Sequence, residues 1–402
     1  MMATNKSMPK KFATIGLFVL GGGAIFGVFY SVSESTIVYD SKPLPVQGEV
    51  IKEEKKVLHI KTPEPLKSVY MSQCYASMPN LRSKLVKMVE ETELNAIVID
   101  VKDYTGTVAF ETGNPNIDSV GGKGCKVADM KEFIEELHSK QIYTIARLTV
   151  FQDPQYTKLH PELAVKKKSD GSVWHDRKGL AFIDVGAKPF WDYIISIATS
   201  SHAIGFDEIN FDYIRFPSDG NMSDIMFTHA GTVPKREALR KFFEYLDTKM
   251  SEAQIPTSAD IFGMTTTNTD DLNIGQVLEI ALVNFDYVAP MVYPSHYPPM
   301  FNGWKDPNKV PYEIVKFSMD SAVRRANALR EEVASSTPSS KLLDRLGPRQ
   351  LRTWIQDFDY PVPYTPDMVR AQFKATYDAG LTSWMLWDPA NTYTPSVLLK
   401  EM

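Results

Sequence analysis

Five aspartates follow short apolar runs of the sequence in a recurring way. They are Asp100, Asp212, Asp260, Asp357 and Asp388. If these runs are the parallel strands of one barrel, the carboxyl groups converge on one mouth, where barrel enzymes build their sites. Converging carboxyl groups are what glycosidic cleavage requires, because one serves as general acid and another as nucleophile or base. The alternative chemistry for such a cluster is the binding of a divalent cation.

The densest polar stretch is the segment 205–217. Side chains alternate along a strand, so Glu208, Asn210 and Asp212 share one face. Asp212 is nearest the expected open end, and we predict that it is a catalytic carboxylate. Arg215 lies just beyond it and is expected to hold Asp212 ionised or to bind substrate. A purely structural pair of Asp212 and Arg215 is the alternative.

The second predicted catalytic carboxylate is Asp260. The segment 207–214 resembles the chitinase-type strand Asp-x-x-Asp-x-Asp-x-Glu, but Ile214 occupies the position of the catalytic Glu. A different carboxyl group must then act as the acid. Asp260 ends the next strand and has the apolar neighbours Ala259 and Ile261, a setting that raises the pKa of a carboxyl group and suits a general acid.

Other polar and aromatic residues at strand ends are expected to shape the substrate site. Aromatic rings can stack on the apolar faces of sugars. No metal ion and no cofactor is predicted, because the sequence shows no paired metal-ligand spacing, phosphate-binding loop or nucleophile elbow. The predicted substrate-binding residues are Asp100, Lys102, Asp103, Arg147, Asn210, Arg215, Tyr293, His296, Trp387 and Asp388.

Strand-like and helical patterns alternate from Ser68 onward. Eight strands with intervening helices predict a (β/α)8 barrel with loop insertions. A doubly wound sheet is disfavoured because no glycine-rich phosphate turn follows the first strand. Long insertions after the second, third and sixth strands, at 105–126, 152–189 and 295–309, fall on the mouth. The predicted strands are 68–75, 96–103, 143–151, 208–216, 256–263, 286–294, 352–360 and 383–389.

The N-terminal region predicts export. Three lysines in residues 1–11 precede an uncharged apolar run, residues 12–30, which is close to the length of about 20 that a transmembrane helix needs. This charge asymmetry places the N-terminus in the cytoplasm and the remainder outside. We predict a single-pass anchor, a polar linker over 31–66 and a barrel over 67–402. A cleaved signal peptide, giving a secreted protein, is the alternative.

Charge and cysteine content narrow the partners. The net charge is −5, without a basic cluster beyond the N-terminus, so no nucleic-acid partner is expected. Cys74 and Cys125 are the two cysteines. They form either one disulfide or two free thiols.

The chain from about Val69 resembles a bacterial family of glycoside hydrolases with a barrel domain, long labelled as a domain of unknown function. The resemblance implies a glycosidase-type barrel and leaves the sugar open. A polysaccharide or cell-wall glycan is therefore the expected substrate. Two alternatives remain: a non-catalytic carbohydrate-binding barrel and a metal-dependent polysaccharide deacetylase or hydrolase. Six blocks carry the resemblance: 95–103, 145–147, 206–220, 258–263, 290–297 and 384–388.

Overall fold

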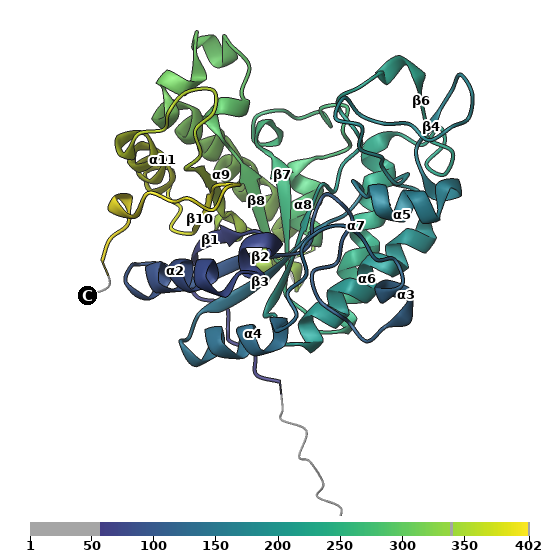
Figure 1. Ribbon diagram of the computed structural model, residues 1–402. Helices are drawn as coiled ribbons and strands as arrows, with labels where there is room; N and C mark the ends of the chain where they lie inside the picture. Colours follow the sequence, from purple (N-terminus) through teal and green to yellow (C-terminus); the bar gives the residue numbers. More distant parts are fainter. Residues whose placement is uncertain (1–56, 338–340, 401–402) are drawn as a thin grey trace, which may run out of the picture. The chain divides into compact units, whose positions relative to one another are not determined.

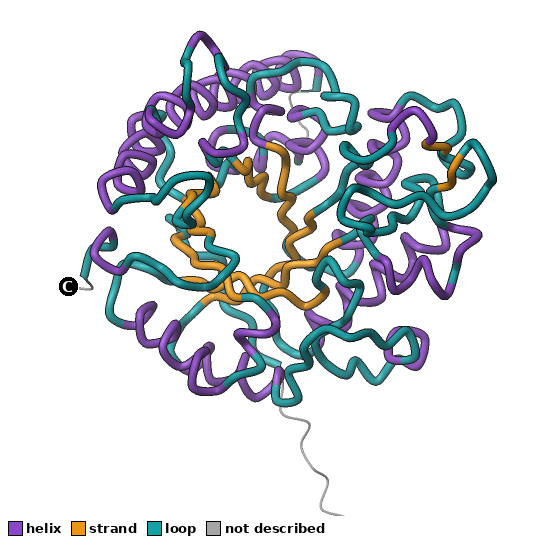
Figure 2. The backbone as a smooth tube through the Cα atoms, turned by 45° about the horizontal axis from the view of Figure 1, so that its top comes forward, coloured by secondary structure: helices purple, strands orange, loops and turns teal. Residues whose placement is uncertain are grey.

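The computed structural model describes residues 57–337 and 341–400 of the chain. In this part, eight parallel strands close into a barrel, and helices surround it (Figure 2). This is the (β/α)8 architecture, so the predicted barrel is confirmed. The predicted membrane segment 12–30 lies outside the described residues. Among the residues that are described, no helix is both long and apolar enough to span a membrane.

All eight predicted strands are present, each somewhat shorter than its apolar run. Around the barrel, the first strand pairs with the second and with the last, which closes the sheet. The strands are β1 (Lys67–Met71), β2 (Ala96–Lys102), β3 (Tyr143–Thr149), β5 (Glu208–Asp212), β7 (Thr257–Phe262), β8 (Tyr287–Met291), β9 (Thr353–Gln356) and β10 (Trp384–Trp387).

Helices cover the outside of the barrel (Figure 1), and their apolar side chains are buried against the strands. In the helix over 235–252, for example, Leu239, Phe242 and Leu246 recur at helical spacing and are fully buried. The helices are α1 (Gln73–Ala76), α2 (Pro79–Glu90), α3 (Pro115–Asp118), α4 (Met130–Ser139), α5 (Pro154–Leu159), α6 (Lys188–Ala203), α7 (Lys235–Glu252), α8 (Leu278–Asn284), α9 (Pro311–Ser336), α10 (Leu342–Arg345) and α11 (Pro366–Asp378).

Alternation along β5 determines what enters the barrel. Glu208, Asn210 and Asp212 bond to side chains of other barrel strands, whereas Phe211 belongs to the outer apolar core. The face predicted for these three polar residues is therefore correct. Because they lie inside a closed barrel, each needs a polar partner to offset the loss of water.

The insertion after β3 contributes to a lobe that the sequence patterns did not predict. Its strand β4 (Lys166–Lys167) pairs antiparallel with β6 (Ile225–Met226), which follows β5. Trp174 is almost completely buried in the small core of this lobe and packs against Phe182. Its ring is therefore not available to stack on a sugar. In Figure 1 the lobe lies at the upper right, beyond α5.

Each end of the barrel has one further stabilising feature. Cys74 and Cys125 form a disulfide, which settles the alternative that the sequence left open. It joins α1, after β1, to the insertion after β2. Residues 57–66 contact the opposite end of the barrel, where the Ile60 amide donates to Asp207 and Thr62 bonds to Tyr143.

Candidate active site

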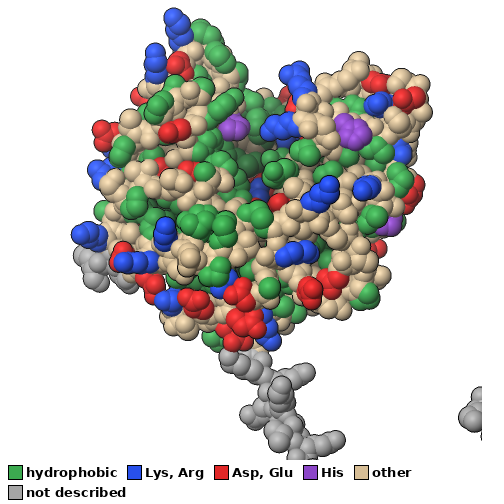
Figure 3. Space-filling model, viewed as in Figure 1, with side chains coloured by type: hydrophobic (Ala, Val, Ile, Leu, Met, Phe, Trp, Pro, Cys, Tyr) green, Lys and Arg blue, Asp and Glu red, His purple; other side chains and the backbone are tan. Residues whose placement is uncertain are grey.

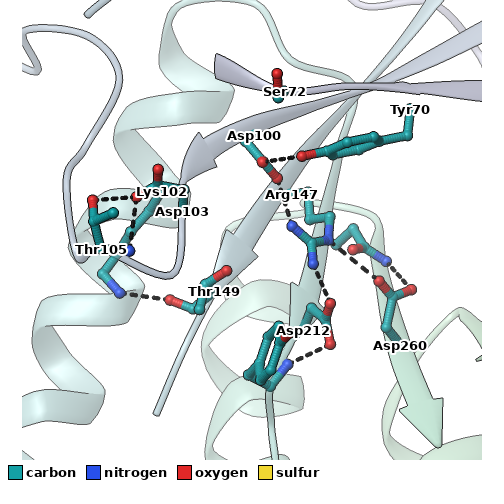
Figure 4. Close-up of polar contacts among 12 residues, drawn as sticks. Tyr70, Ser72, Asp100, Lys102, Asp103, Thr105, Arg147, Thr149, Asp212 and Asp260 are labelled. Carbon is teal, nitrogen blue, oxygen red and sulfur yellow. Dashed lines mark hydrogen bonds and ion pairs between the residues drawn. The ribbon is translucent and has the colours of Figure 1, made fainter. Parts of the chain in front are cut away.

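Arg147 is the centre of a buried charge cluster at the mouth of the barrel. It extends from β3, and its guanidinium contacts three carboxylates on neighbouring strands (Figure 4). Nη1 donates to Asp100 on β2 at 2.6 Å, and Nη2 donates to Asp212 on β5. Nε lies 3.6 Å from Asp260 on β7. One cation therefore neutralises part of the charge that three convergent strands bring together.

Aromatic rings enclose this cluster. Tyr70 donates to Asp100 at 2.5 Å, and its ring stacks on Trp387 with centroids 3.8 Å apart. The guanidinium carbon of Arg147 lies 4.9 Å from the Trp387 ring centroid, within the range of a cation–π interaction. The rings thus fix the plane of the guanidinium and exclude water from it.

Asp260 has different partners from Asp212. Its Oδ1 accepts hydrogen bonds from Asn210 at 2.9 Å and from the indole Nε1 of Trp354 at 2.8 Å. Burial, followed by the negative charge of Asp212, raises the pKa of Asp260 to about 7. Arg147 and the two hydrogen bonds oppose this rise without cancelling it. A carboxyl group with such a pKa holds a proton near neutrality, as a general acid must.

The separation of the two predicted catalytic carboxyl groups follows from Arg147. Both contact the same rigid, planar guanidinium, one by a hydrogen bond and the other at 3.6 Å, so their nearest oxygens lie within about 8 Å of each other. Glycosidases place their two carboxyl groups about 5 to 9.5 Å apart. The upper limit for this pair lies within the range that glycosidases use.

The carboxyl pair opens into a cavity of about 300 Å³, which we call the mouth pocket. Figure 3 shows the surface hollowed between two raised parts of the molecule. Seven of the twelve predicted site residues line the pocket. These are Arg147, Asp212, Arg215, Asp260, Tyr293, His296 and Trp387.

A larger cleft of about 1110 Å³ adjoins the mouth pocket, and we call it the Asp357 cleft. The two cavities share His296, Phe358 and Pro389 in their linings. The cleft also contains Asp357 and Asp388, the last two strand-end aspartates. The five aspartates thus lie at one end of the barrel, as predicted. Two line each cavity, and Asp100 lines neither but bonds to Arg147.

Comparison with known proteins identifies the family of the chain. The model of a family described as "Putative glycosyl hydrolase domain" matches residues 68–393. The chain belongs to this glycosyl hydrolase family. The match confirms the family resemblance seen in the sequence blocks. No curated protein matches the chain significantly.

Several solved structures are similar to this chain. The glycoside hydrolase domain of PgaB (BpsB) from Bordetella bronchiseptica has a TM-score of 0.57 at 13% identity, covering 84% of this chain and 99% of that chain. A hypothetical protein from Ruminiclostridium thermocellum ATCC 27405 is 32% identical, with a TM-score of 0.43, and covers 51% of this chain and 98% of its own. The spore cortex-lytic enzyme SleL from Bacillus megaterium QM B1551 is 11% identical, with a TM-score of 0.46 and coverages of 83% and 72%. The PgaB domain shows that the fold is shared.

Arg215 is not the partner of Asp212 in this member of the family. Its guanidinium bonds to the Phe216 carbonyl and the Ser218 hydroxyl, and it lies 5.4 Å from the Tyr213 ring centroid. The predicted pair of Asp212 and Arg215 is therefore wrong, and Arg147 takes that place. Arg215 still lines the mouth pocket, where it can contact a substrate.

Two other predicted site residues lie outside the pocket. Lys102 is completely buried on the outer side of the barrel, 2.9 Å from Asp153, and it also donates to the Thr149 carbonyl. Asp103 accepts hydrogen bonds from the amide and hydroxyl of Thr105 and so shapes a turn. Figure 4 shows both at a distance from the Arg147 cluster. Their placement does not support the predicted substrate contacts.

Asp100 and Asn210 do not line the mouth pocket but bond to residues that do. Asp100 accepts from Arg147 and Asn210 donates to Asp260. The sequence reasoning missed Tyr70 and Trp354, which bond to Asp100 and Asp260. Alternation along the strands could have identified them. The residues beside Tyr70 in β1 and beside Trp354 in β9 point outward, so Tyr70 and Trp354 themselves point into the barrel.

Proposed function

We propose that the protein is an exported, membrane-tethered glycoside hydrolase that cleaves a polysaccharide with Asp260 as general acid and Asp212 as nucleophile or base. The observation that carries this proposal is the raised pKa of Asp260 beside a second carboxylate in one pocket of the barrel mouth. Environments that differ between two neighbouring carboxyl groups are the basis of acid–base division in glycosidases.

The cleavage step follows from the proton that Asp260 holds. Asp260 gives this proton to the glycosidic oxygen as the bond from that oxygen to the anomeric carbon breaks. Asp212, which accepts a hydrogen bond from the Arg147 guanidinium, attacks the anomeric carbon or takes a proton from the attacking water. Arg147 does not compete for the acid role, because its contacts with Asp212 and Asp100 outweigh burial and raise its pKa well above the usual value.

The first test is the pH dependence of cleavage. A panel of bacterial exopolysaccharides and wall glycans is incubated with the protein, and new reducing ends are measured. We expect one glycan to be cleaved with a rate that falls as the pH rises through about 7, because Asp260 loses the proton that it must donate. Binding of a glycan without cleavage across the whole panel would favour the non-catalytic barrel instead.

A variant of Trp354 makes this test specific to Asp260. The indole of Trp354 stabilises the carboxylate form, so Trp354→Phe should raise the pKa of Asp260 further. The fall of the cleavage rate with pH, which we call the alkaline limb, should then move to higher pH. Trp384→Phe is the matched control, because Trp384 is equally buried but its indole donates to Tyr377. A limb that stays in place in Trp354→Phe would show that another group provides the proton.

Export and tethering rest on the apolar run over residues 12–30 and on the disulfide, a bond of oxidising compartments. We expect cell fractionation to leave the intact chain in the membrane. Protease added outside intact cells should then remove the barrel. A shortened, soluble form in the medium would indicate a cleaved signal peptide, and a chain protected from the protease would contradict export.

A further inference from the structure

The Asp357 cleft is more than three times as large as the mouth pocket that it adjoins. A row of aromatic rings connects the two cavities. Tyr293 of the mouth pocket contacts Phe358 edge-on, Phe358 contacts His296, and His296 lies 6.4 Å from the ring of Tyr360, measured between centroids. Tyr360 lines the cleft with 58% of its surface exposed. The site therefore continues beyond the reacting carboxyl groups along an aromatic wall.

Three carboxyl groups line the same cleft: Asp357, Asp359 and Asp388. In the described part of the chain, they accept hydrogen bonds from backbone amides and one hydroxyl, for example from Thr394 to Asp357 and from Ala390 to Asp388. None of the three has an ion pair within residues 57–337 and 341–400. Lys178, from the loop after β3, is the one Lys or Arg side chain among the described lining residues.

The charge of the cleft restricts the polymer that it can hold. Carboxylates repel the carboxylates or phosphates of an anionic glycan and attract an ammonium group. Aromatic faces beside carboxylates also suit ammonium groups through cation–π contacts. Burial raises the pKa of Asp357 to about 6, which still leaves it largely charged at neutral pH.

We propose that the Asp357 cleft binds the sugar residues next to the scissile bond and favours residues that carry a free amino group, so that the enzyme cleaves within amino-sugar chains. This inference rests on the proposed hydrolase function for the scissile bond, but the binding preference can be measured without cleavage. Tyr360 is the stacking platform for one sugar ring, and Asp359 is the most accessible of the three carboxylates.

The test measures binding with the full chain carrying Asp212→Asn, so that cleavage does not interfere. The probes are hexamers of glucosamine, N-acetylglucosamine and galacturonic acid, which are cationic, neutral and anionic. We expect the glucosamine hexamer to bind at least about fivefold more tightly than the neutral one, a difference that salt reduces, and the anionic one to bind most weakly. Equal binding of the three, a preference for galacturonic acid or no binding of any would overturn the proposal.

Two further substitutions locate the binding in the cleft. Tyr360→Ala should weaken binding of the glucosamine hexamer about tenfold, and Asp359→Asn should weaken it two- to fivefold while leaving the neutral hexamer unaffected. Asparagine keeps the acceptor that Tyr364 uses, so the loop is preserved. Glu332→Gln is the matched control, because it removes an exposed charge near the C-terminal end of α9, away from the cleft. Equal losses in Asp359→Asn and Glu332→Gln would place the binding elsewhere.

The same measurements separate this inference from the proposed function. If the charge preference and its dependence on Asp359 hold but no glycan in the panel is cleaved, the cleft is a binding site and the hydrolase proposal fails. If a glycan is cleaved but the three hexamers bind equally, the hydrolase proposal stands and the amino-sugar preference fails.

Discussion

Asp212→Asn is expected to lower the turnover of the cleaved glycan by about 10³-fold or more, while the fold and sugar binding remain. Asparagine has nearly the same shape as aspartate and keeps one oxygen acceptor for Arg147, but it can neither attack the anomeric carbon nor take a proton from water. Positioned acid–base groups typically contribute 10²- to 10⁴-fold to a rate. The measurement is the rate of reducing-end release at saturating glycan, together with a thermal melt.

Asp103→Asn is the matched control for this substitution. Asp103 also follows a barrel strand and is mostly buried, but its carboxylate bonds within its own turn, outside the mouth pocket. We expect the control to stay within about twofold of the unaltered protein, as is usual for changes that touch no reacting group. Unchanged turnover in Asp212→Asn would remove Asp212 from the mechanism, whatever the control shows.

The barrel could be predicted because its signals are local. Each strand is an apolar run, and each strand-end aspartate follows its own run directly. The positions of Asp212 and Asp260 at one mouth follow from the fold alone, since parallel strands all end on the same side. The raised pKa of Asp260 also agrees with the sequence expectation, although the largest cause of this rise is burial inside the barrel and not its apolar neighbours in sequence alone.

The predicted placements of Lys102 and Arg215 failed because of local irregularities in the strands, which a two-residue alternation cannot show. The pairing of β2 with β3 shifts between Asp100 and Lys102, so Lys102 leaves the face that alternation assigns to it. Tyr213 adopts a left-handed φ of 51°, which ends the regular strand before Arg215 is reached. Side chains beyond such points cannot be assigned to a face by counting.

The partner of Asp212 could not be predicted without the order of the strands around the barrel. Arg147 is opposite Asp100 on one side and Asn210 on the other, because β3 lies between β2 and β5. In sequence, Arg215 is much closer to Asp212 than Arg147 is, and proximity in sequence favoured the wrong partner. The hydrogen bond from Trp354 on β9 to Asp260 on β7 reaches across β8. The sequence shows only that Trp354 points into the barrel and does not indicate this partner.

Arg147→Met is expected to lower the stability of the fold strongly. Methionine fills much of the same volume without charge, so the variant leaves Asp100, Asp212 and Asp260 buried together without their common cation. Removing one partner of a buried ion pair typically costs about 3–5 kcal/mol in the free energy of unfolding. Urea denaturation at pH 8 measures this loss, and turnover of the remaining folded protein should fall because the carboxyl groups lose their positions.

The loss of stability should depend on pH. The Arg147 guanidinium opposes the rise that burial and Asp212 cause, so without it the pKa of Asp260, already about 7, rises further in the folded variant. A group whose folded pKa is raised binds more protons in the folded state than in the unfolded one, so lowering the pH stabilises the variant relative to the unaltered protein. The difference in unfolding free energy between the two proteins should therefore be smaller at pH 5 than at pH 8.

Arg352→Met separates the two roles of Arg147. Arg352 is equally buried inside the barrel and bonds to Glu208 at 2.7 Å, but it lines neither the mouth pocket nor the Asp357 cleft. Arg352→Met should lower the free energy of unfolding by a similar amount. The folded fraction should keep its turnover, and its cleavage rate should still fall as Asp260 loses its proton at rising pH. If both arginine variants lost turnover equally per folded molecule, Arg147 would be a structural residue of the barrel and not the positioning residue of its two catalytic carboxyl groups.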